Sequence, residues 1–431
     1  MTRRIAVLGA GALGLTAALR LAQRGETVTV FEREPVPGGL AAGFRPGGDS
    51  GPWLEKFYHH LFQTDTHAIG LIQELGLGAD LTWHRPRTVV LHGGRFHQLD
   101  SALSLIRFRP LPVLSRFRMG IGLAYLKALG SPRRLEGARA APWIRGQMGD
   151  AAADVVWEPL LRAKFGDAAD TIGLPWFWAR VHDRTSRLGY LGGGFQRLYE
   201  ALATRVAEDG TVLLGREVTE IRRNGGQLTV SHRAVGDQPV ATDAFDAVLS
   251  TLPTRLTALL TPEMPTEWRE RHDPGPALGA HCLILALDRP LTDAYWINLN
   301  DPGFPFLAAV EHTNMRSTEE YGGRHLLYLG SYLPMDDPVL RADPEELLTE
   351  WLPAIQRLNP KLDRSWITQV WKFAAPYAQP IVTVDYPKRI PPFQTPIDGL
   401  WIANMFQVYP HDRGQNYSIA LAEEVVSSLA A

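Results

Sequence analysis

The order of hydrophobic and polar residues at the start of the chain predicts a strand, a turn, a helix and a second strand. Residues 5–8 are all apolar and partly β-branched, which is typical of a short buried strand. Apolar residues between 13 and 22 recur on one side of a helix, which Gly25 ends. Residues 27–32 alternate and are β-branched, so they predict a strand that ends at Glu32. The chain therefore opens on a strand–helix–strand unit of an α/β fold.

Similar patterns continue along the chain. Residues 210–230 predict a hairpin with its turn at 224–226, and residues 192–194 predict a packing turn before a helix. Residues 344–360 predict a helix with Pro344 just inside its start. Further strands are predicted at 245–253, 276–291, 305–314 and 324–334. The chain ends with a strand, a loop and a helix.

The first turn has the glycine spacing of a dinucleotide-binding motif. Gly9 permits the tight turn, Gly11 lets a pyrophosphate approach the backbone, and Gly14 lets helix and strand pack closely. The helix that begins at Ala12 and Leu13 offers amide hydrogens and a positive dipole end to the phosphates. Since the strand–turn–helix context is present, we expect a bound dinucleotide.

Glu32 lies about 20 residues past the turn, where a carboxylate accepts hydrogen bonds from both ribose hydroxyls. A 2′-phosphate would meet a like charge there, so the acid indicates an unphosphorylated ribose. On these residues alone, NAD and FAD both stay open.

Composition narrows the class of protein. The 431 residues are enough for two cores, and a net charge of −2 argues against nucleic-acid binding. A single cysteine, Cys282, excludes a disulfide framework, and no set of side chains has metal-ligand spacing. The N-terminus does not resemble a signal peptide, and no apolar run reaches the ~18 residues of a membrane span. We therefore expect a cytoplasmic protein.

The segment after Glu32, "REPVPGGLAAGF", adds a second glycine pair, Gly38 and Gly39. It resembles the extended FAD signature of the amine oxidase and protoporphyrinogen oxidase superfamily, which includes carotenoid desaturases and UDP-galactopyranose mutases. The resemblance implies a glycine loop along the pyrophosphate and ribityl chain. The usual arginine after the pair is here Leu40, so the phosphate charge needs another partner, with Arg33 the near candidate.

Two later segments carry the same resemblance. It implies that the hairpin covers the adenine, with Val218 as the contact residue. It also implies that the last helix points its N-terminus at the flavin pyrimidine, through Asn416, Tyr417 and Ser418. Asn404 stands where the family has an acidic ribityl contact. The cofactor expected is FAD, held non-covalently because Cys282 is far from this C-terminal segment.

The expected architecture is a discontinuous Rossmann-type FAD-binding domain and a mixed α+β substrate domain. We assign 1–62, 188–262 and 385–431 to the first domain. The second contains a helical part, 63–187, and a part that mixes strands and helices, 263–384.

Five residues are candidates for chemistry. His59 and His60 form an aromatic-flanked pair where the chain crosses between the domains. His281 stands about where amine oxidases carry a lysine, and Glu311 and His312 end an apolar strand. We expect one histidine of the pair, with His60 favoured, to act as a general base.

The resemblance implies dehydrogenation of a small or lipophilic organic molecule by hydride transfer to flavin N5. The alternative is a redox-neutral sugar mutase or epimerase, which the histidines and the polar strand end would suit. A flavin-bearing binding protein is the third and least favoured alternative.

Residues 103–134 combine large apolar side chains with arginines and lysines. Such a segment can lie on an anionic membrane. The favoured alternative is a core-facing helix pair with a solvated basic face.

Overall fold

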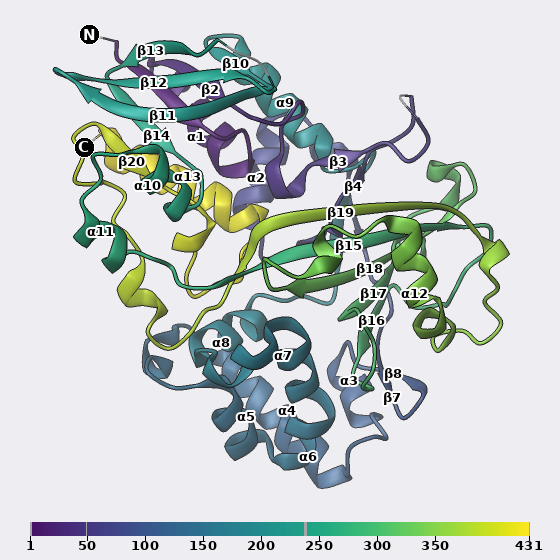
Figure 1. Ribbon diagram of the computed structural model, residues 1–431. Coiled ribbons are helices and arrows are strands. Elements are labelled where there is room, and N and C mark those ends of the chain that lie inside the picture. Colours follow the sequence, from purple (N-terminus) through teal and green to yellow (C-terminus); the bar gives the residue numbers. More distant parts are fainter. Residues whose placement is uncertain (1, 49, 237–238, 431) are drawn as a thin grey trace.

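The computed structural model describes residues 2–48, 50–236 and 239–430 (Figure 1). At one end of the molecule lies a parallel sheet whose order, β10-β2-β1-β14-β20, confirms the predicted α/β class. Its strands are Thr211–Leu213 (β10), Thr27–Phe31 (β2), Arg4–Leu8 (β1), Ala247–Ser250 (β14) and Leu400–Ile402 (β20). The middle strands are almost wholly apolar because both faces of the sheet are covered.

Helices from both ends and from the middle of the chain cover one face of this sheet. They are Ala12–Gln23 (α1), Thr66–Glu74 (α2), Gln196–Ala207 (α9) and Gln415–Ala430 (α13). α1 contacts α9 and α13, and α2 also contacts α13. The boundary predicted at residue 62 separates α2 from this layer, although α2 packs on α13.

The predicted hairpin forms β11, Arg216–Asn224, and β12, Gln227–Ala234, with Asn224 opposite Gln227 at the turn. A third strand, Ala241–Phe245 (β13), pairs with β12. Residues 211–213, expected in the hairpin, instead join the parallel sheet through β2. The two sheets share the cluster that contains Phe31, Ile221 and Val230.

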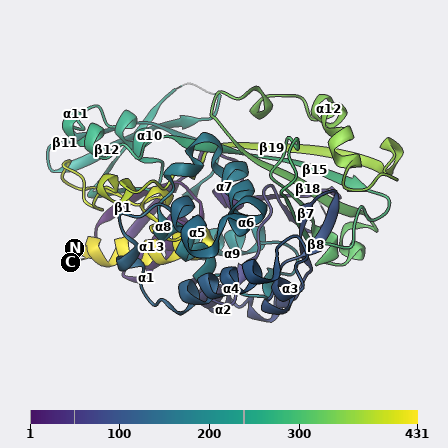
Figure 2. The ribbon, with the colours of Figure 1, turned by 90° about the horizontal axis from the view of Figure 1, so that it is seen from below.

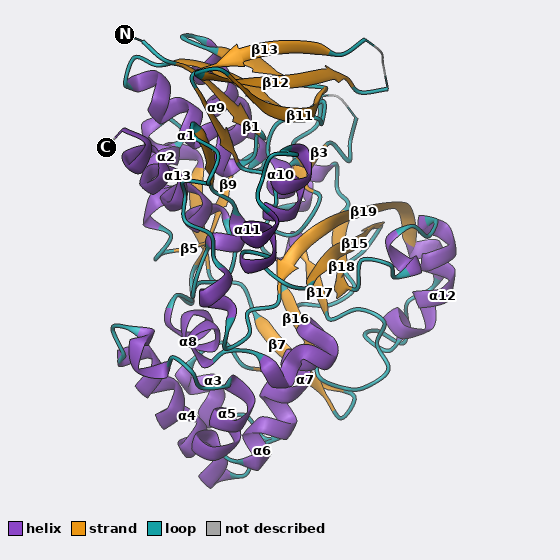
Figure 3. Cartoon of the chain, turned by 60° about the vertical axis from the view of Figure 1, so that its left-hand side comes forward, coloured by secondary structure: helices purple, strands orange, loops and turns teal. Residues whose placement is uncertain are grey.

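A seven-stranded sheet of order β19-β15-β18-β17-β16-β7-β8 forms the middle of the molecule (Figure 3). Its strands are Ile367–Pro380 (β19), Ala277–Leu287 (β15), His325–Leu333 (β18), Ala308–Glu311 (β17), Trp296–Leu299 (β16), Thr88–His92 (β7) and Arg95–Gln98 (β8). The helix Pro344–Gln356 (α12) buries Leu347, Leu348 and Trp351 against it. β7 and β8 lie within residues 63–187, which were predicted to be helical. They are strands because β7 pairs in parallel with β16 of this sheet.

Small sheets connect these layers. The chain crosses at β5, Leu61–Phe62, which pairs with β9, Leu188–Leu191, and β9 also pairs with β6, Leu81–His84. Gly43–Phe44 (β3) pairs with Leu54–Glu55 (β4). The short helices Thr254–Leu260 (α10) and Thr266–Arg271 (α11) follow β14.

A lobe of helices with its own hydrophobic core lies at the opposite end of the molecule from the parallel sheet, and Figure 2 shows it from below. Its helices are Ala102–Ile106 (α3), Val113–Ala128 (α4), Ala140–Met148 (α5), Asp150–Ala152 (α6), Glu158–Phe165 (α7) and Leu174–His182 (α8). Within the described residues, no helix has both the length and the hydrophobicity needed to cross a membrane.

The amphipathic segment 103–134 forms α3, α4 and a short 3-10 turn. α4 buries only Met119, Gly122 and Leu126, whereas Leu114 and Ile121 are 80% and 71% exposed. The expectation of a core-facing helix pair is therefore met only in part, because much of the apolar face lies at the surface.

Candidate functional site

The glycines of the first turn have two different roles, one in packing and one beside open space. A Cβ at Gly14 would lie 1.9 Å from the carbonyl oxygen of Gly9, so this glycine allows α1 to approach β1. A Cβ at Gly11 would meet only the Gly39 Cα, at 4.0 Å. Gly11 is thus not required by packing, and the open space beside it adjoins the first amides of α1. A phosphate group fits such a position at a helix N-terminus.

The second glycine pair lies against the first turn. The Gly38 N–H donates to the Ala10 carbonyl at 2.8 Å, and a Cβ at Gly39 would be 3.4 Å from Gly11 Cα. Gly38 and Gly39 have φ values of 118° and 56°, a region that favours glycine. Together the two turns leave a backbone-lined cradle of the kind that an FAD pyrophosphate requires.

Glu32 is fixed at the edge of this cradle. One carboxylate oxygen accepts a hydrogen bond from Ala10 N at 2.8 Å, and the other accepts one from Glu34 N at 2.9 Å. The Arg216 N–H donates to the Glu32 carbonyl at 2.7 Å, so the hairpin begins beside it, and Val218 follows half-buried. The structure thus brings together the residues predicted for the ribose and the adenine.

Two predicted cofactor contacts find no support. The Arg33 side chain is 65% exposed and lies 3.6 Å from the Glu34 carboxylate, so a role at the phosphates has no basis in its contacts. Asn404 is 2% exposed, and its side-chain amide donates to Leu252 O and Thr254 Oγ1. Because both donors are used, the predicted ribityl contact has no free amide hydrogen.

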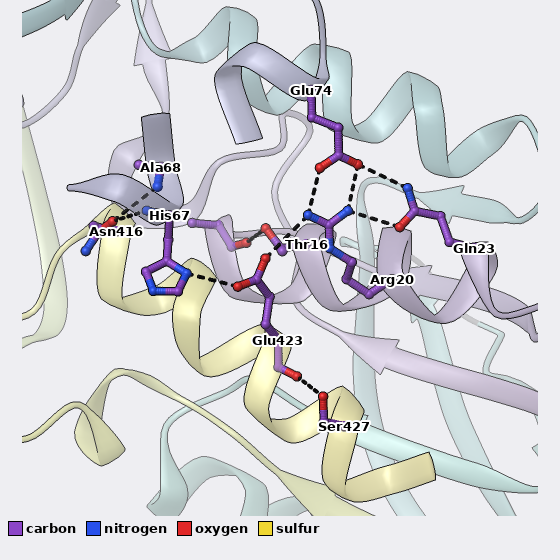
Figure 4. A network of polar contacts seen from close by, with 10 residues as sticks. Thr16, Arg20, Gln23, His67, Ala68, Glu74, Asn416, Glu423 and Ser427 are labelled. Atoms are coloured by element: carbon purple, nitrogen blue, oxygen red, sulfur yellow. Dashed lines mark hydrogen bonds and ion pairs between the residues drawn. The ribbon is translucent and has the colours of Figure 1, made fainter. Parts of the chain in front are cut away.

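The start of α13 is held in place by neighbouring helices. Asn416 Oδ1 accepts hydrogen bonds from the first amides of α2, His67 N at 2.9 Å and Ala68 N at 3.1 Å (Figure 4). Glu423 pairs with His67 and Arg20 in the same network. Asn416 is therefore a cap for α2 as well as a residue of the predicted flavin helix, and Ser418 N donates to Gly414 O inside the first turn.

Two adjoining cavities extend from the start of α13 into the helical lobe. The inner one has a volume of about 220 Å³ and is lined by residues 58–62 and 412–417. The outer one has a volume of about 530 Å³, and most of its lining side chains are apolar. His60, Trp296 and Asn298 line both. Arg180 and Arg184 also line both cavities, so the outer cavity has a basic side where it adjoins the inner one.

The inner cavity contains an ionic cluster that the sequence analysis missed. Lys164 Nζ donates to Asp412 at 2.8 Å, and Arg180 approaches the same carboxylate at 3.4 Å. Arg184 and Arg413 complete the basic side of the lining. One sequence signal could have indicated part of this cluster. Asp412 and Arg413 directly precede the last helix, which was predicted to approach the flavin.

Burial changes the protonation behaviour of this cluster. It lowers the pKa of Lys164 to about 7, despite the attraction of Asp412, and that of Arg184 to about 9. Burial opposes ionisation of Asp412, but Lys164, Arg180 and Arg413 still hold its pKa well below the usual range. Two groups that line this cavity therefore have a pKa that suits proton exchange near neutral pH: Lys164, and Asp65, whose pKa burial raises to about 6.

His59 and His60 both line the inner cavity, whereas one of the pair was expected at the site, and burial determines what they can do. His59 Nδ1 donates to Phe57 O, and burial lowers its pKa to about 4. His60 Nδ1 lies 3.1 Å from the Tyr295 hydroxyl, and burial together with the charge of Arg184 lowers its pKa to about 3. An imidazole with such a pKa is a poor general base at neutral pH. His60 is better suited to hold a substrate by a neutral hydrogen bond.

We expect His60→Ala to slow flavin reduction by substrate about two- to tenfold, the value of one hydrogen bond. The pH profile between 5 and 8 should not change, because the imidazole is neutral throughout that range. Rapid mixing of enzyme and substrate under anaerobic conditions measures the rate. His60→Gln should restore part of it, and His59→Ala is the control. Equal effects of the two alanine variants would remove His60 from the site.

The other three candidates have different surroundings. Glu311 is 0% exposed, and its carboxylate accepts from the amides of Leu291 and Thr292 at 2.8 Å, so it holds a turn. His312 Nε2 contacts the Tyr321 hydroxyl at 2.9 Å, and neither residue lines the two cavities. We assign both a structural role, since their polar groups already have partners.

His281, on β15, packs against Trp351 of α12. It also borders a smaller cavity of about 50 Å³ that Leu40, His59 and Arg413 line. Neither ring nitrogen of His281 has a hydrogen-bond partner among the described residues, and burial lowers its pKa to about 4. Its position next to His59 keeps it near the predicted flavin end of the site.

A protein-family model described as "flavin containing amine oxidoreductase" matches residues 14–410. The chain belongs to this family. It is thus an FAD-dependent oxidoreductase, and the two glycine turns with Glu32 fit that cofactor. Glu32, the cradle and the start of α13 would hold it.

Relatives of this chain include a 15-cis-phytoene desaturase of Synechococcus elongatus. The two are 25% identical over 398 residues, which cover 83% of this chain and 80% of the desaturase. A flavin-dependent L-tryptophan oxidase of Lentzea aerocolonigenes is 28% identical over a region that covers 61% of this chain and 62% of the oxidase.

Solved structures show the same fold. A putative protoporphyrinogen oxidase from Exiguobacterium matches with a TM-score of 0.77 and 18% identity, over 100% of this chain and 99% of the other. A reduced UDP-galactopyranose mutase matches with a TM-score of 0.73 and 16% identity, over 100% and 96%.

We expect the FAD to be bound non-covalently. Cys282 is 1% exposed in the middle of β15, where it pairs with Gly330 and Phe373, so the thiol is held inside the sheet. Acid precipitation should leave the yellow colour in the supernatant. Colour that remains with the pellet would show a covalent link and overturn the expectation.

Proposed function

We propose that this FAD-dependent oxidoreductase dehydrogenates a lipophilic organic substrate that binds in the outer cavity. The volume of about 530 Å³ and the mostly apolar lining support this proposal, since small-molecule sites commonly have 300–1,000 Å³ and few polar groups. Bound FAD would supply a hydride acceptor at N5. The chain's own residues would orient the substrate and remove a proton.

Orientation would come from the wall between the two cavities. His60 is held by Tyr295, and the Trp296 indole N–H donates to Asn298 Oδ1 at 3.0 Å, so these side chains have restricted rotamers. They offer hydrogen-bonding groups at the polar end of an apolar space. A substrate with one polar group would therefore be held by that end.

Lys164, which lines the inner cavity, would accept the proton from the end of the substrate that reaches past His60. With a pKa near 7, a substantial fraction of its amine is neutral at physiological pH, and Asp412 would stabilise the ammonium that forms. The amine is close to Tyr332 and Trp176, at 5.3 and 5.2 Å from the ring centres, which keeps it out of bulk water.

A redox-neutral mutase is a second candidate, and one observation favours it. Lys164, Arg180, Arg184 and Arg413 give the inner cavity four basic side chains, against the carboxylates of Asp65, Asp183 and Asp412. Since Asp183 is already bonded to His411 and Tyr417, an anionic group such as a phosphate would be attracted there.

Anaerobic mixing of the purified flavoprotein with candidate substrates distinguishes the two functions. A dehydrogenase loses its visible flavin absorbance when it is mixed with its substrate alone. A mutase keeps that absorbance and turns over only after prior reduction with dithionite. Bleaching by lipophilic compounds and not by sugar nucleotides is the result that we expect.

We also propose a division into an FAD-binding domain (1–62, 188–262 and 385–431) and a substrate domain (63–187 and 263–384), with α2 moved to the first. The packing of α2 on α13 supports that change. Limited proteolysis with and without FAD tests it, since bound cofactor should protect residues 66–74 together with the first domain.

A further inference from the structure

The outer faces of α3 and α4 form an apolar surface. Of the twelve large hydrophobic side chains that are exposed in the described part of the chain, seven lie between residues 103 and 125. Two of them, Leu114 and Ile121, are 80% and 71% exposed. The apolar α3–α4 surface consists of Leu103, Ile106, Val113, Leu114, Phe117, Ile121 and Tyr125. Contiguous exposure of this kind marks a contact surface for another molecule or for a membrane.

The charged residues within this segment all have one sign. Residues 101–135 contain no aspartate or glutamate but seven arginines and lysines, in a protein whose net charge is −2. Among the basic residues, Arg107, Arg109, Arg118 and Arg134 are exposed. An apolar face with a basic border is complementary to the hydrocarbon and anionic headgroups of a lipid bilayer.

The same two helices also wall the outer cavity. Leu105 of α3 and Met119, Leu123 and Ala124 of α4 line it, while their neighbours form the apolar α3–α4 surface. The inward-facing side chains of both helices thus contact the cavity that is proposed to bind a lipophilic substrate. A surface that lies on lipid would bring that space next to the acyl chains.

We propose that the apolar α3–α4 surface docks this protein onto an anionic lipid bilayer, as a peripheral contact. This goes beyond the proposed function, because binding to vesicles requires no substrate. A second copy of the chain is the competing occupant. A two-fold dimer through this face would set the basic border of one copy against that of the other, which repulsion opposes.

Flotation of the FAD-loaded protein with phosphatidylcholine vesicles, with and without phosphatidylglycerol, tests the proposal. We expect the protein to float with the anionic vesicles. Leu114→Asp/Ile121→Asp should lower the partition coefficient at least about tenfold, since charges at an interface oppose insertion. Arg107→Glu/Arg109→Glu should lower it at least about tenfold on anionic vesicles, because each basic residue near such a surface contributes to binding.

Leu259→Asp is the matched control, since Leu259 is 72% exposed on α10, away from the apolar α3–α4 surface. It should float like the wild type, and all variants should keep their FAD and melting temperature. Failure of the wild type to float, or unchanged flotation of both double variants, would overturn the proposal. A dimer in solution that Leu114→Asp/Ile121→Asp dissociates would assign the surface to a second copy instead.

Discussion

Lys164→Met should reduce the rate of flavin reduction by substrate by about 10²–10⁴, the usual contribution of a general base. Methionine retains most of the buried volume beside Phe165 and Trp176 but cannot accept a proton. The rate is measured by rapid anaerobic mixing, with a substrate identified by bleaching.

The pH dependence provides an independent readout. A base acts in its neutral form, so the wild-type rate should rise with pH as Lys164 loses its proton around pH 7. That step should be absent in Lys164→Met. Asp412→Asn removes the anion that favours the ammonium, so the step should move to lower pH.

Lys388→Met is the control, because Lys388 is 79% exposed and pairs with Asp385 at the surface. It should react at the wild-type rate. A Lys164→Met enzyme that keeps the step near pH 7 would show that another group accepts the proton, and the proposed role of Lys164 would be wrong.

Glu32→Ala should weaken FAD binding by about two to four orders of magnitude while the fold survives. Hydrogen bonds from two ribose hydroxyls to a carboxylate contribute about 1.5–3 kcal/mol each, and each 1.4 kcal/mol is about tenfold in affinity. Titration of the apoprotein with FAD, followed by flavin fluorescence, gives the dissociation constant. Glu34→Ala is the control, since its carboxylate lies 3.6 Å from Arg33 at the surface. Equal affinities would disprove the ribose contact.

Two of the three glycines of the first turn, Gly11 and Gly14, distinguish effects on cofactor binding from effects on folding in the same assay. Gly11→Ala should fold and lose affinity, because the added Cβ enters open space beside the phosphates. Gly14→Ala should reduce thermal stability as well, because its Cβ would collide with the Gly9 carbonyl. A Gly11→Ala protein that binds FAD normally would show that the pyrophosphate does not approach this residue.

The dinucleotide-binding unit could be predicted because its determinants are local. Gly9, Gly11, Gly14 and Glu32 lie within 24 consecutive residues, and turn geometry and helix dipoles act over such short distances. The alternation that predicted the hairpin is local in the same way, and the register Asn224–Gln227 follows from its turn. The β7–β8 ribbon was missed because its partner, β16, is some 200 residues away along the chain.

The candidate active site depended on tertiary structure. Lys164, Arg180 and Asp412 come from α7, α8 and the loop before α13, so no sequence spacing brings them together. His60 was predicted at the site from its place in the chain, but burial decides its pKa and therefore its role. Glu311 looked functional as a polar strand end until the amides of residues 291 and 292 supplied its partners.

The amphipathic segment 103–134 shows the same limit. The sequence by itself determined that its helices have an apolar and a basic character, since these follow from composition and period. Only the packing of the helical lobe decided that Leu114 and Ile121 stay outside while Met119 and Leu126 are buried. The physical reason is that burial and electric field at a side chain are sums over neighbours from the whole fold, whereas turns and helix ends respond to a few adjacent residues.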